Sequence, residues 1–338
     1  MSKILVTGGA GFIGSNFVRL VLQGKKHQVV NVDSLTYAGN LENLKDVEKA
    51  SGYGFVKADI TRRGEMEAVF AQHRPDVVVH FAAESHVDRS VLDASTFVMT
   101  NVLGTQVLID VARLHKVARF VHVSTDEVYG SLGATGYFTE ETPLQPNSPY
   151  SASTTGSDLL VRAAHHTHRF PALITRCSNN YGPFQFPEKL IPLMIANALE
   201  GKKLPVYGNG KNVRDWIYVT DHCEAILRVL EAGRDGEVYN IGGNSERENI
   251  TVVKQILKLL CKGEESIHYV TDRPGHDLRY AIDNTKIRKE LGWEPQHSFE
   301  TALAKTVEWY VTNRDWWQRV RSGAYRDYYD QQYGQRLR

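Results

Sequence analysis

Two adjacent acidic residues, Asp126 and Glu127, directly follow an apolar run at 119–124 that we predict to be a buried strand. Polar side chains at the end of such a strand lie at the edge of the sheet where α/β proteins bind their ligands. One carboxyl group can serve as an acid and its neighbour as a base when their surroundings differ. An arbitrary Asp-Glu pair is more often a solvated loop, so the interpretation depends on the other motifs.

A glycine-rich segment near the N-terminus indicates dinucleotide binding. Gly8, Gly11 and Gly14 follow a predicted strand and open a predicted helix. Glycine at these positions permits a tight turn, the approach of a pyrophosphate and close helix–strand packing, while the helix N-terminus offers free N–H groups to phosphate. Asp33 ends the next strand, nineteen residues after Gly14. Its carboxylate can there accept hydrogen bonds from the adenosine ribose.

The cofactor predicted from this region is NAD rather than NADP. A 2′-phosphate is usually recognised by a basic residue close to the second strand, and no arginine or lysine occurs between Asn31 and Asn40. Asp59 and Ile60 end the third predicted strand and are candidate adenine contacts. A simple strand-terminal polar residue is an equally good interpretation of Asp59.

These motifs require a scaffold in which strands and helices alternate. Such alternation implies right-handed βαβ units and a parallel sheet covered on both faces, which is a Rossmann-type, doubly wound α/β fold. The predicted strands are 3–7, 28–32, 54–57, 76–82 and 119–124, and the predicted helices are 12–23, 41–50, 64–72 and 96–114, followed by a helix from near Tyr150 and a strand at 172–176.

The composition of the sequence changes after about Pro183, where proline and glycine become frequent. We predict a NAD-binding domain over residues 1–183 that also holds the catalytic residues. A smaller C-terminal α/β region over 184–338 is expected to bind mainly substrate, with some of its chain crossing back to the first domain. It contains a predicted strand at 237–241, helices at 252–260 and 299–313, and an aromatic group interpreted as packing or a subunit contact (Trp309, Trp316, Trp317, Tyr325, Tyr328 and Tyr329).

Composition limits the classes of function. With 40 basic and 39 acidic residues the net charge is +1, so no strong attraction to nucleic acid or an anionic membrane is expected. The three cysteines are too few for a disulfide framework or a zinc site, and Cys177 and Cys223 are interpreted as small buried hydrophobes. The histidines at 165–168 have no nearby partner ligands, so no metal is predicted. Neither a signal peptide nor an apolar run of ~18 residues is evident, which predicts a cytoplasmic protein with no membrane span.

Several longer strings carry a resemblance to a known family. The strings at 8–14, 82–90, 125–127 and 150–153 resemble those of the dTDP-glucose 4,6-dehydratases, a branch of the extended short-chain dehydrogenase/reductase family. The similarity extends over nearly the whole chain and is more specific than any single motif, because its strings are long and distinctive. It continues at 176–183, 186–192, 212–216 and 272–277.

The resemblance implies a hydro-lyase that converts dTDP-glucose to dTDP-4-keto-6-deoxyglucose, a step of deoxysugar biosynthesis. Hydride leaves sugar C4 for NAD+, water is eliminated across C5 and C6, and the hydride returns at C6, so NAD stays tightly bound and is recycled in each turnover. In this scheme Tyr150 takes the O4 proton and Glu127 the C5 proton. Asp126 protonates the departing O6, and Thr125 holds the O4 region. Oxidation at C4 acidifies the C5 hydrogen, so a carboxylate suffices as the base.

The resemblance also implies a homodimer and two sets of binding residues. Relatives pair through a four-helix bundle, which here would include the helices at 96–114 and 150–170. Arginine suits a diphosphate because its planar guanidinium can bind phosphate oxygens bidentately. The implied NAD set is Gly8, Gly11, Phe12, Ile13, Gly14, Asp33, Ser34, Leu35, Thr36, Asp59, Ile60, Phe81, Ala82, Ala83, Ser85, Thr100, Tyr150, Thr154 and Asn180. The implied sugar-nucleotide set is Ser85, Thr125, Asn179, Lys189, Leu190, Pro205, Val206, Tyr207, Arg214, Asn249, Asp272, Arg273 and His276.

The chain departs from the family pattern Tyr-x-x-x-Lys at one position, because Thr154 stands where the lysine is expected. The lysine normally lowers the tyrosine pKa and holds the nicotinamide ribose, whereas threonine can hydrogen-bond the ribose but carries no charge. Three explanations are open: a deliberate substitution, an enzyme that uses the charge of oxidised nicotinamide instead, and a degenerate homologue. The retained residues Thr125, Asp126, Glu127 and Tyr150 favour the first two.

Two other functions compete with dehydration. A sugar-nucleotide C4 epimerase on the same scaffold resembles the chain in its glycine loop, but such epimerases lack the adjacent Asp-Glu pair because they eliminate nothing. A regulator that binds NAD or a sugar nucleotide, with an active site that decayed at Thr154, is the non-enzymatic alternative. The intact Asp126 and Glu127 favour dehydration over both.

Overall fold

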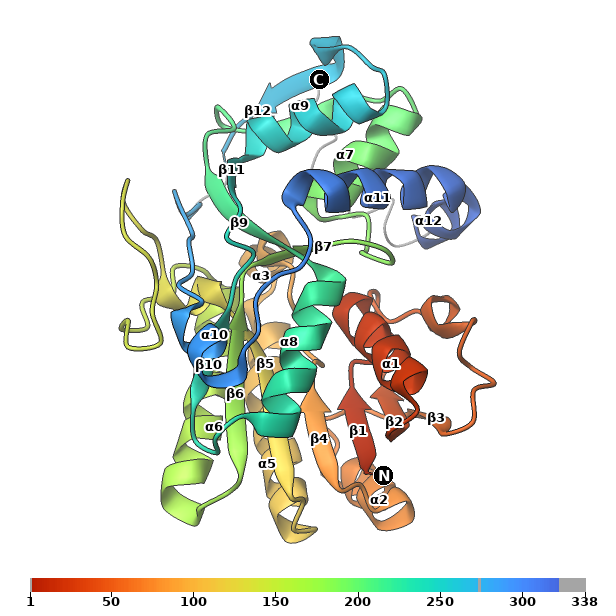
Figure 1. Ribbon diagram of the computed structural model, residues 1–338, viewed down its shortest axis with the longest axis vertical. Coiled ribbons are helices and arrows are strands. Elements are labelled where there is room, and N and C mark those ends of the chain that lie inside the picture. The colour runs from red at the N-terminus through yellow and green to blue at the C-terminus, as the bar shows by residue number, and fades with distance from the viewer. Residues whose placement is uncertain (1, 273–274, 322–338) are drawn as a thin grey trace.

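The computed structural model describes residues 2–272 and 275–321 (Figure 1). Its larger part is a seven-stranded parallel sheet in the order β10-β6-β5-β4-β1-β2-β3, which confirms the Rossmann-type fold. Consecutive strands run outward from β1 in one direction and from β4 in the other, so a crevice opens at their carboxyl ends. The strands are β1 (Lys3–Thr7), β2 (Gln28–Asp33), β3 (Tyr53–Lys57), β4 (Val77–His80), β5 (Arg119–Thr125), β6 (Ala172–Cys177) and β10 (Val238–Ile241).

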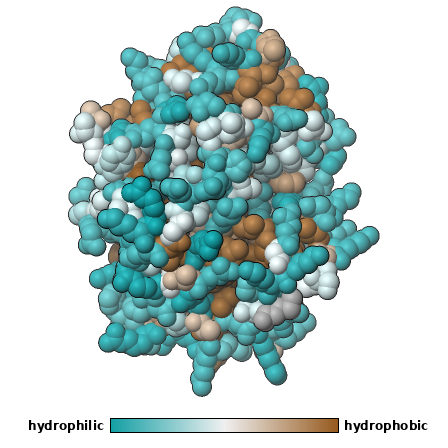
Figure 2. Space-filling view, in the orientation of Figure 1, coloured by the Kyte–Doolittle hydropathy of each residue, from teal (hydrophilic) through white to brown (hydrophobic). Residues whose placement is uncertain are grey.

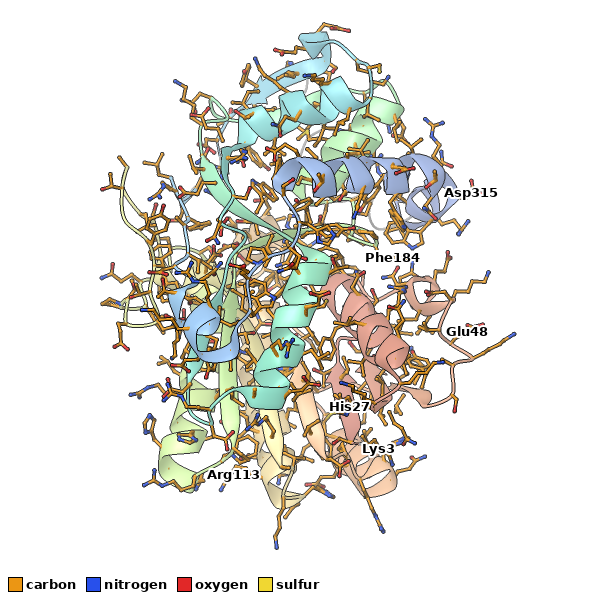
Figure 3. All side chains as sticks on the ribbon, in the orientation of Figure 1. Lys3, His27, Glu48, Arg113, Phe184 and Asp315 are labelled. Atoms are coloured by element: carbon orange, nitrogen blue, oxygen red, sulfur yellow. The ribbon has the colours of Figure 1, made fainter. Side chains whose placement is uncertain are left out.

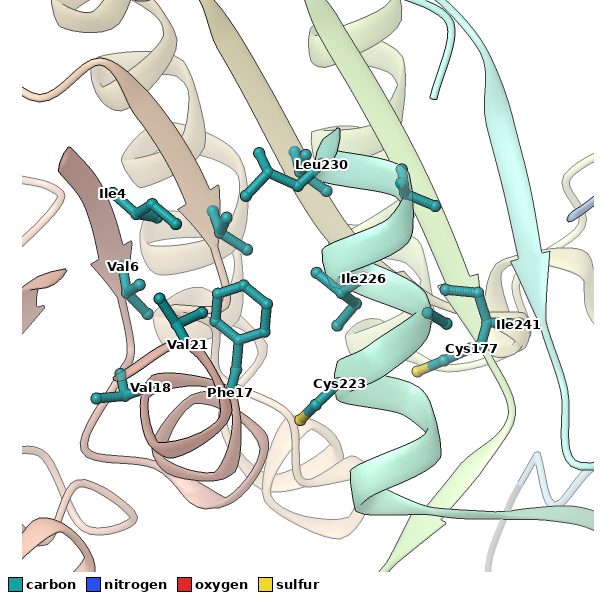
Figure 4. Close-up of a cluster of buried hydrophobic side chains, with 14 of the residues drawn as sticks. Ile4, Val6, Phe17, Val18, Val21, Cys177, Cys223, Ile226, Leu230 and Ile241 are labelled. Atoms are coloured by element: carbon teal, nitrogen blue, oxygen red, sulfur yellow. The ribbon is translucent and has the colours of Figure 1, made fainter. Parts of the chain in front are cut away.

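Helices cover both faces of this sheet because its strands are apolar on both sides. One face packs against α1 (Phe12–Gly24) and α8 (Val219–Ala232), and the other packs against α2 (Arg63–His73), α5 (Thr105–Leu114) and α6 (Pro149–His168). The first of these layers is drawn in Figure 4, where Phe17 and Ile226 fill the space between the helices and the sheet.

Two cysteines belong to the same apolar layer. Cys177 lies at the end of β6 and Cys223 on α8, and both are buried (Figure 4). Burial raises the pKa of each thiol far above its ordinary value. The prediction that they act as small hydrophobes is therefore confirmed, since a reactive cysteine needs a populated thiolate.

The prediction of a helix at 41–50 was wrong. Only a short 3₁₀ turn, η1 (Leu41–Leu44), forms, and a chain of turns follows it. The reason is a tertiary contact: the carbonyl of Asn43 accepts a hydrogen bond from the Arg19 guanidinium on α1. In an α-helix the Val47 N–H would donate to that carbonyl, but here it donates to Leu44, 2.9 Å away.

The helix predicted at 96–114 is longer and contains an irregular turn. It runs through α4 (Ala94–Phe97), a π-helical segment η2 (Val98–Gly104) and then α5. The widened turn brings Asn101 to the loop after β4, where its side chain bonds both the N–H and the carbonyl of Glu84. Its amide also donates to Ser153 on α6, 2.9 Å away.

This same run is apolar enough to pass a membrane-span test. Among the described residues, Ala94–Leu114 has the required length of 21 residues and a mean hydropathy of 1.2. Core helices of globular proteins pass the same test. One side of this run, including Leu108, Ile109 and Val111, packs into the apolar layer beneath the sheet.

The smaller lobe lies above the carboxyl ends of the large sheet (Figure 1). Its helices share one apolar core with the strand β9. Three elements that follow β9, namely α8, β10 and α10 (Thr285–Leu291), return to the large sheet. The lobe consists of β7 (Asn179–Tyr181), α7 (Leu190–Leu199), β8 (Leu204–Tyr207), β9 (Val213–Tyr218), β11 (Glu246–Glu248), α9 (Asn249–Leu259), β12 (Ile267–Val270), α11 (Phe299–Thr312) and α12 (Arg314–Val320).

Phe184 joins the two lobes (Figure 3). Its ring centroid lies 4.7 Å from that of Trp309 and 5.9 Å from that of Trp316, and the Arg19 guanidinium of α1 lies over the ring, 4.4 Å from its centroid. Trp317 is fully buried in the core of the smaller lobe. The tryptophans therefore serve packing, as predicted, while Tyr325, Tyr328 and Tyr329 lie outside the described residues. Figure 2 shows that the face in view is mostly hydrophilic, with apolar side chains exposed in separate patches.

Candidate active site

A single cleft collects the segments that follow the strands of the large sheet. It is lined by Gly8 after β1, Asp33 at the end of β2, Asp59 after β3, Phe81 after β4 and Thr125 at the end of β5. Parallel strands bring these positions to one edge although they are far apart in the sequence. Of the residues predicted to bind NAD, all except Leu35 line the cleft.

The glycine turn has the geometry of a phosphate cradle. Gly8 has a φ of +70°, and a Cβ there would come within 2.7 Å of the Ala82 nitrogen. A Cβ on Gly14 would come within 2.3 Å of the Gly8 oxygen. The chain itself thus requires glycine at both positions, whereas a Cβ on Gly11 would meet only that oxygen, at 3.2 Å.

Gly11 leaves the start of α1 open toward the cleft. It is the N-cap of the helix, no side chain caps the first N–H groups, and the first turn holds no acidic residue. Free N–H groups and the positive end of the helix dipole favour an anion at such a position. The residues present therefore fit the diphosphate of a dinucleotide.

Asp33 is held rigidly beside this turn. One of its oxygens accepts a hydrogen bond from the Ala10 N–H at 3.0 Å and the other accepts from the Leu35 N–H at 2.8 Å. Burial raises the pKa of the Asp33 carboxyl, and these two hydrogen bonds oppose the rise. Each oxygen keeps a lone pair that can accept a ribose hydroxyl. Leu35 thus contacts Asp33 through its backbone N–H and does not itself line the cleft.

The two adjacent carboxyl groups occupy a 3₁₀ turn, η3 (Asp126–Tyr129), directly after β5. The Thr125 hydroxyl caps this turn by accepting from the Glu127 N–H, and it donates to Asp126 Oδ1 at 3.4 Å. Asp126 is only 1% exposed, and its Oδ2 has no hydrogen-bond partner among the described residues. Glu127 is half-buried and lines the cleft.

The surroundings of Asp126 favour its protonated form. Burial raises the pKa of the Asp126 carboxyl well above its ordinary range, and the negative charge of Glu127 raises it further. A carboxyl group that holds its proton at neutral pH can act as a general acid. The pair therefore offers one proton donor and one more exposed carboxylate in the same turn.

Tyr150 enters the cleft from the first turn of α6. Ser148 caps this helix through a capping box with Ser151, and Pro149 occupies the first helical position. The Tyr150 hydroxyl hydrogen-bonds Thr125. Burial and the charge of Glu127 raise the pKa of the phenol well above 10. Tyr150 is therefore a neutral phenol at physiological pH in this structure.

Thr154 lines the same cleft but supplies no charge to the phenol. Its hydroxyl donates to the Tyr150 backbone carbonyl, 3.1 Å away. This bond to the preceding helical turn holds the side chain against its own helix. The largest influences on the Tyr150 pKa include no cation.

A buried ionic network lies behind Tyr150 and the acidic turn. Asp158, one turn beyond Thr154 on α6, accepts from the Arg176 guanidinium at 2.8 Å. Arg176 on β6 also donates to the Tyr129 hydroxyl of η3 at 2.9 Å. Arg176 thereby ties the helix that carries Tyr150 to the turn that carries Asp126. No sequence motif singled out this network.

Four of the predicted sugar-nucleotide residues, Ser85, Thr125, Asn179 and Lys189, line the cleft. Lys189 donates to the Ser85 carbonyl at 2.7 Å. Arg214 is buried, donates to the Asp277 carbonyl at 3.0 Å and lies over the Tyr280 ring. Leu190, Pro205, Val206, Tyr207, Arg214, Asn249, Asp272 and His276 do not line the described cleft, and Arg273 lies outside the described residues.

Comparison with known proteins decides the family. The family described as GDP-mannose 4,6 dehydratase matches residues 5–306. The chain belongs to this family. A dTDP-glucose 4,6-dehydratase of Xanthomonas campestris pv. campestris (strain B100) is 56% identical, over 96% of this chain and 98% of the relative. The dTDP-glucose 4,6-dehydratase 1 of Escherichia coli (strain K12) is 52% identical, over 98% of this chain and 99% of the relative.

Solved structures of the family add detail about ligands. A dTDP-glucose 4,6-dehydratase of Streptomyces venezuelae, crystallised with NAD and TYD bound, is 52% identical. It superposes with a TM-score of 0.92 over 94% of this chain and 99% of that one. A UDP-glucose 4-epimerase of Thermotoga maritima superposes with a TM-score of 0.86 but is 31% identical, over 92% of this chain and 99% of that one. The fold is thus shared with epimerases, while the sequence is closer to the dehydratases.

Sequence reasoning missed several parts of the cleft wall in this family member. Four of the missed residues, Cys177, Ser178, Phe186 and Glu188, lie within the strings that carry the resemblance but were assigned to no site, and only the folded geometry brings the missed residues to the wall. They include Tyr37, Ala38, Gly39, Asn101, Thr105, His122, Ser124, Ser157, Cys177, Ser178, Gln185, Phe186 and Glu188.

Proposed function

We propose that this chain is an NAD-dependent dTDP-glucose 4,6-dehydratase. The observation that carries the proposal is the buried Asp126, whose pKa is raised, beside the more exposed Glu127, in the cleft that also holds the glycine cradle. An oxidation or an epimerisation at C4 needs no second acid–base pair. Elimination of water across C5 and C6 needs both a base and an acid.

The residues present suit NAD as the resident cofactor. Gly11 and the open start of α1 would hold the diphosphate, and Asp33 would hold the adenosine ribose. When bound, NAD would supply hydride transfer at this site, as the acceptor for the hydride of sugar C4 and as its donor to C6.

Tyr150 takes the proton of the sugar O4 hydroxyl in this proposal. Thr125 orients the phenol through their hydrogen bond and lies beside the same oxygen. Because the pKa of Tyr150 is raised and Thr154 carries no charge, the proton acceptor is scarce at neutral pH. We therefore expect this chain to turn over slowly, with its reaction type unchanged.

Elimination then uses the two carboxyl groups in separate roles. Glu127 removes the proton from C5, which the C4 ketone has acidified. Asp126 gives its proton to O6, which leaves as water. Once C6 has regained its hydrogen, a proton returns to C5 and the 4-keto-6-deoxy sugar is complete. Two protons leave the substrate, from O4 and C5, and two are supplied, to O6 and C5. The proton that Glu127 removed returns to C5, and the proton that Tyr150 took from O4 passes through solvent to Asp126, so all three residues regain their initial states.

The remaining assignments of the sugar-nucleotide site follow the family. Ser85, Asn179 and Lys189 would contact the sugar from the cleft wall. The other proposed contacts lie outside the described cleft, and they would hold the diphosphate and the base of the nucleotide: Leu190, Pro205, Val206, Tyr207, Arg214, Asn249, Asp272, Arg273 and His276.

Product analysis tests the proposed reaction. The protein is incubated with dTDP-glucose and, in parallel, with UDP-glucose, and the sugars are identified by NMR. A 4-keto-6-deoxy product from dTDP-glucose is expected. A galactose epimer would favour the epimerase, and no product from either substrate, even with Thr154→Lys, would exclude the dehydratase.

We also propose that two copies of the chain pair through the faces of α5 and α6. Val98, Met99 and Leu103 project from the run before α5, and Leu159 projects from α6; each is 41–51% exposed. Exposed apolar residues gathered on neighbouring helices are typical of a homodimer surface. A second copy would cover them in a four-helix bundle.

The cytoplasm is the proposed location. Cys177, Cys223 and Cys261 are all free thiols, and Cys261 is exposed. An exposed free thiol suits a reducing compartment.

A further inference from the structure

Glu188 is a buried carboxylate at the wall of the cleft that the proposed reaction does not use. Its side chain is only 2% exposed, and it lies in the segment between β7 and α7. Arg89 Nε donates to its Oε2 at 3.1 Å, and His86 Nε2 lies 3.8 Å from the same oxygen. The Tyr37 phenol also hydrogen-bonds this carboxylate. Burying a charged group costs free energy unless it is paired in this way.

The ring of Tyr37 is in contact with both Arg89 and Phe186. The Arg89 guanidinium lies over its ring, 4.0 Å from the centroid. The ring of Phe186 meets it edge-on, with centroids 5.5 Å apart and planes at 88°. Cation–π and edge-to-face contacts of this kind are attractive and depend on direction, so they fix the position of the phenol.

These residues belong to three separate segments of the chain. Tyr37 lies in the loop 34–40 after β2, Arg89 in the short helix α3 (Val87–Leu92) after β4, and Glu188 in the segment before α7. Residues of the loop after β2 and of the segment before α7 line the cleft, and so does the loop 81–85 that leads into α3. The contacts of Tyr37 and Arg89 with Glu188 thus bridge the cleft wall from the side of Asp33 to the smaller lobe.

We propose that Glu188, Tyr37 and Arg89 form a latch that holds these three segments together over the bound dinucleotide and slows its release. The inference rests on the proposed function, in which the cofactor stays bound between turnovers. Tyr37 is four residues beyond Asp33, the proposed ribose partner. The loop between them can move away from the cofactor only after the contacts of Tyr37 break. Glu188 is therefore a positioning residue and takes no part in the chemistry.

The latch is also sensitive to pH. Burial raises the pKa of Glu188 to about 7, against the opposing effects of Lys189 and Arg89 and the hydrogen bonds from Arg89 and Tyr37. In an open latch, water would return the pKa toward its ordinary 4.5. The charged or titratable groups that face this cluster are Arg89 and His86 from α3 and its cap, Lys189 from its own segment, Tyr37 from the loop after β2, and Glu84, which faces Tyr37 from the loop after β4.

The direction of the pH effect follows from these two values. A carboxyl group with a higher pKa in the closed state takes up a proton as the latch closes. The closed state is therefore most favoured at low pH. Its stability relative to the open state falls as the pH rises from 4.5 to 7 and changes little above 7. Linkage between the two pKa values gives ~20-fold faster release at pH 7.5 than at pH 5.5.

The test measures cofactor release from the holoenzyme. Protein loaded with radiolabelled NAD is mixed with an excess of unlabelled NAD, and the retained label is followed by rapid filtration. We expect Glu188→Ala to release NAD about 10–100-fold faster and Tyr37→Phe about 2–10-fold faster, as expected for a lost hydrogen bond with a charged group and with a phenol. Glu140→Ala is the control. Glu140 also accepts a buried hydrogen bond, from the Asn240 N–H at 2.9 Å, but it lies outside the cleft wall.

A second comparison separates the latch from general loosening of the fold. Glu188→Gln keeps the size of the side chain but cannot ionise, so its release rate should be the same at pH 5.5 and 7.5. Equal release rates at pH 7.5 in wild type, Glu188→Gln and Tyr37→Phe, with unchanged thermal unfolding, would overturn the latch. A wild-type protein that retains no labelled NAD would instead overturn the cofactor assignment in the proposed function.

Discussion

The hydroxyl of Thr154 donates to the backbone carbonyl of Tyr150, and the two oxygens lie 3.1 Å apart. A long basic side chain at this position would leave the helix backbone and reach along the same face of α6 toward the phenol. In its place, threonine completes a bond within the helix. The charge balance around Tyr150 is therefore negative, because the charge of Glu127 raises the pKa of the phenol.

We expect Thr154→Lys to raise kcat by about 10²–10⁴-fold, since a nearby cation lowers the pKa of Tyr150 and makes its basic form available. The pH profile of kcat should change with it, and the acidic limb should move to lower pH. Steady-state assays with dTDP-glucose across pH check both effects. Thr154→Met provides length without charge, so an equal gain in that variant would contradict the electrostatic explanation.

Asp126→Asn should abolish the loss of water from C6, while oxidation at C4 and removal of the C5 proton continue. Asn has nearly the shape of the buried acid but has no proton to give to O6. Wild-type activity should also fall as the pH rises through the raised pKa of Asp126, because only the protonated form is competent. Product formation and exchange of the C5 hydrogen with deuterated solvent distinguish the steps, and the variant should retain exchange without forming product.

Glu127→Gln is the complementary change. Glu127 is proposed as the base at C5, so this variant should lose both C5 exchange and product formation. Its thermal unfolding should stay close to that of the wild type because the side chain is half-buried. Exchange that persists in Glu127→Gln would assign the base to another residue.

The scaffold could be predicted well because its strands are apolar runs in the sequence and because glycines mark the turn after the first strand. β1 and β5 were predicted to within one residue, and the glycine turn and Asp33 meet as expected. The false helix at 41–50 illustrates the limit. A local pattern cannot show that Arg19, which lies on another helix, donates a hydrogen bond to the Asn43 carbonyl.

The same limit applies to the cleft. Asp126 and Glu127 were recognisable as an acid–base pair, but their different burial appears only in the fold. Glu188 and Tyr37 meet across about 150 residues of sequence. Neither belongs to a short motif with a known mechanism, so their contact could not be predicted from spacing.

The glycine turn permits a prediction in which two similar substitutions have different effects. Gly11→Ala should weaken NAD binding with little loss of fold stability, because a Cβ there meets one oxygen at 3.2 Å and otherwise faces the cleft. Gly14→Ala should chiefly destabilise the fold, because its Cβ would come within 2.3 Å of the Gly8 oxygen. Calorimetric NAD titration and thermal unfolding of both variants check this. Equal loss of stability in the two would contradict it.

The buried pair of Asp158 and Arg176 permits a prediction about stability. Burial raises the pKa of Asp158, but the charge of Arg176 and the hydrogen bonds outweigh burial, so the pKa lies below its ordinary 3.8. A depressed pKa contributes stability above pH 3.8 that is lost as the pH falls through the folded-state value. Asp158→Asn should cost about 3–5 kcal/mol at pH 7, and the difference from wild type should shrink below about pH 4.

Denaturant unfolding at several pH values measures this difference, and Asp46→Asn is the matched control. Asp46 makes an ion pair of similar length with Arg19, at 2.7 Å, but its side chain is 55% exposed. An exposed pair contributes only about 0–1 kcal/mol. A similar loss in both variants would show that burial does not set the contribution of the Asp158 pair.

The proposed subunit contact predicts a change of assembly. Met99→Glu combined with Leu103→Glu should convert a dimer into a monomer, because it would bury two unpaired charges in an apolar interface. Leu259→Glu is the control, since Leu259 is similarly exposed at 43% but lies on α9 of the smaller lobe. Sedimentation velocity across a range of concentrations measures the assembly state. A wild-type monomer, or a dimer that survives the double substitution, would exclude this face as the interface.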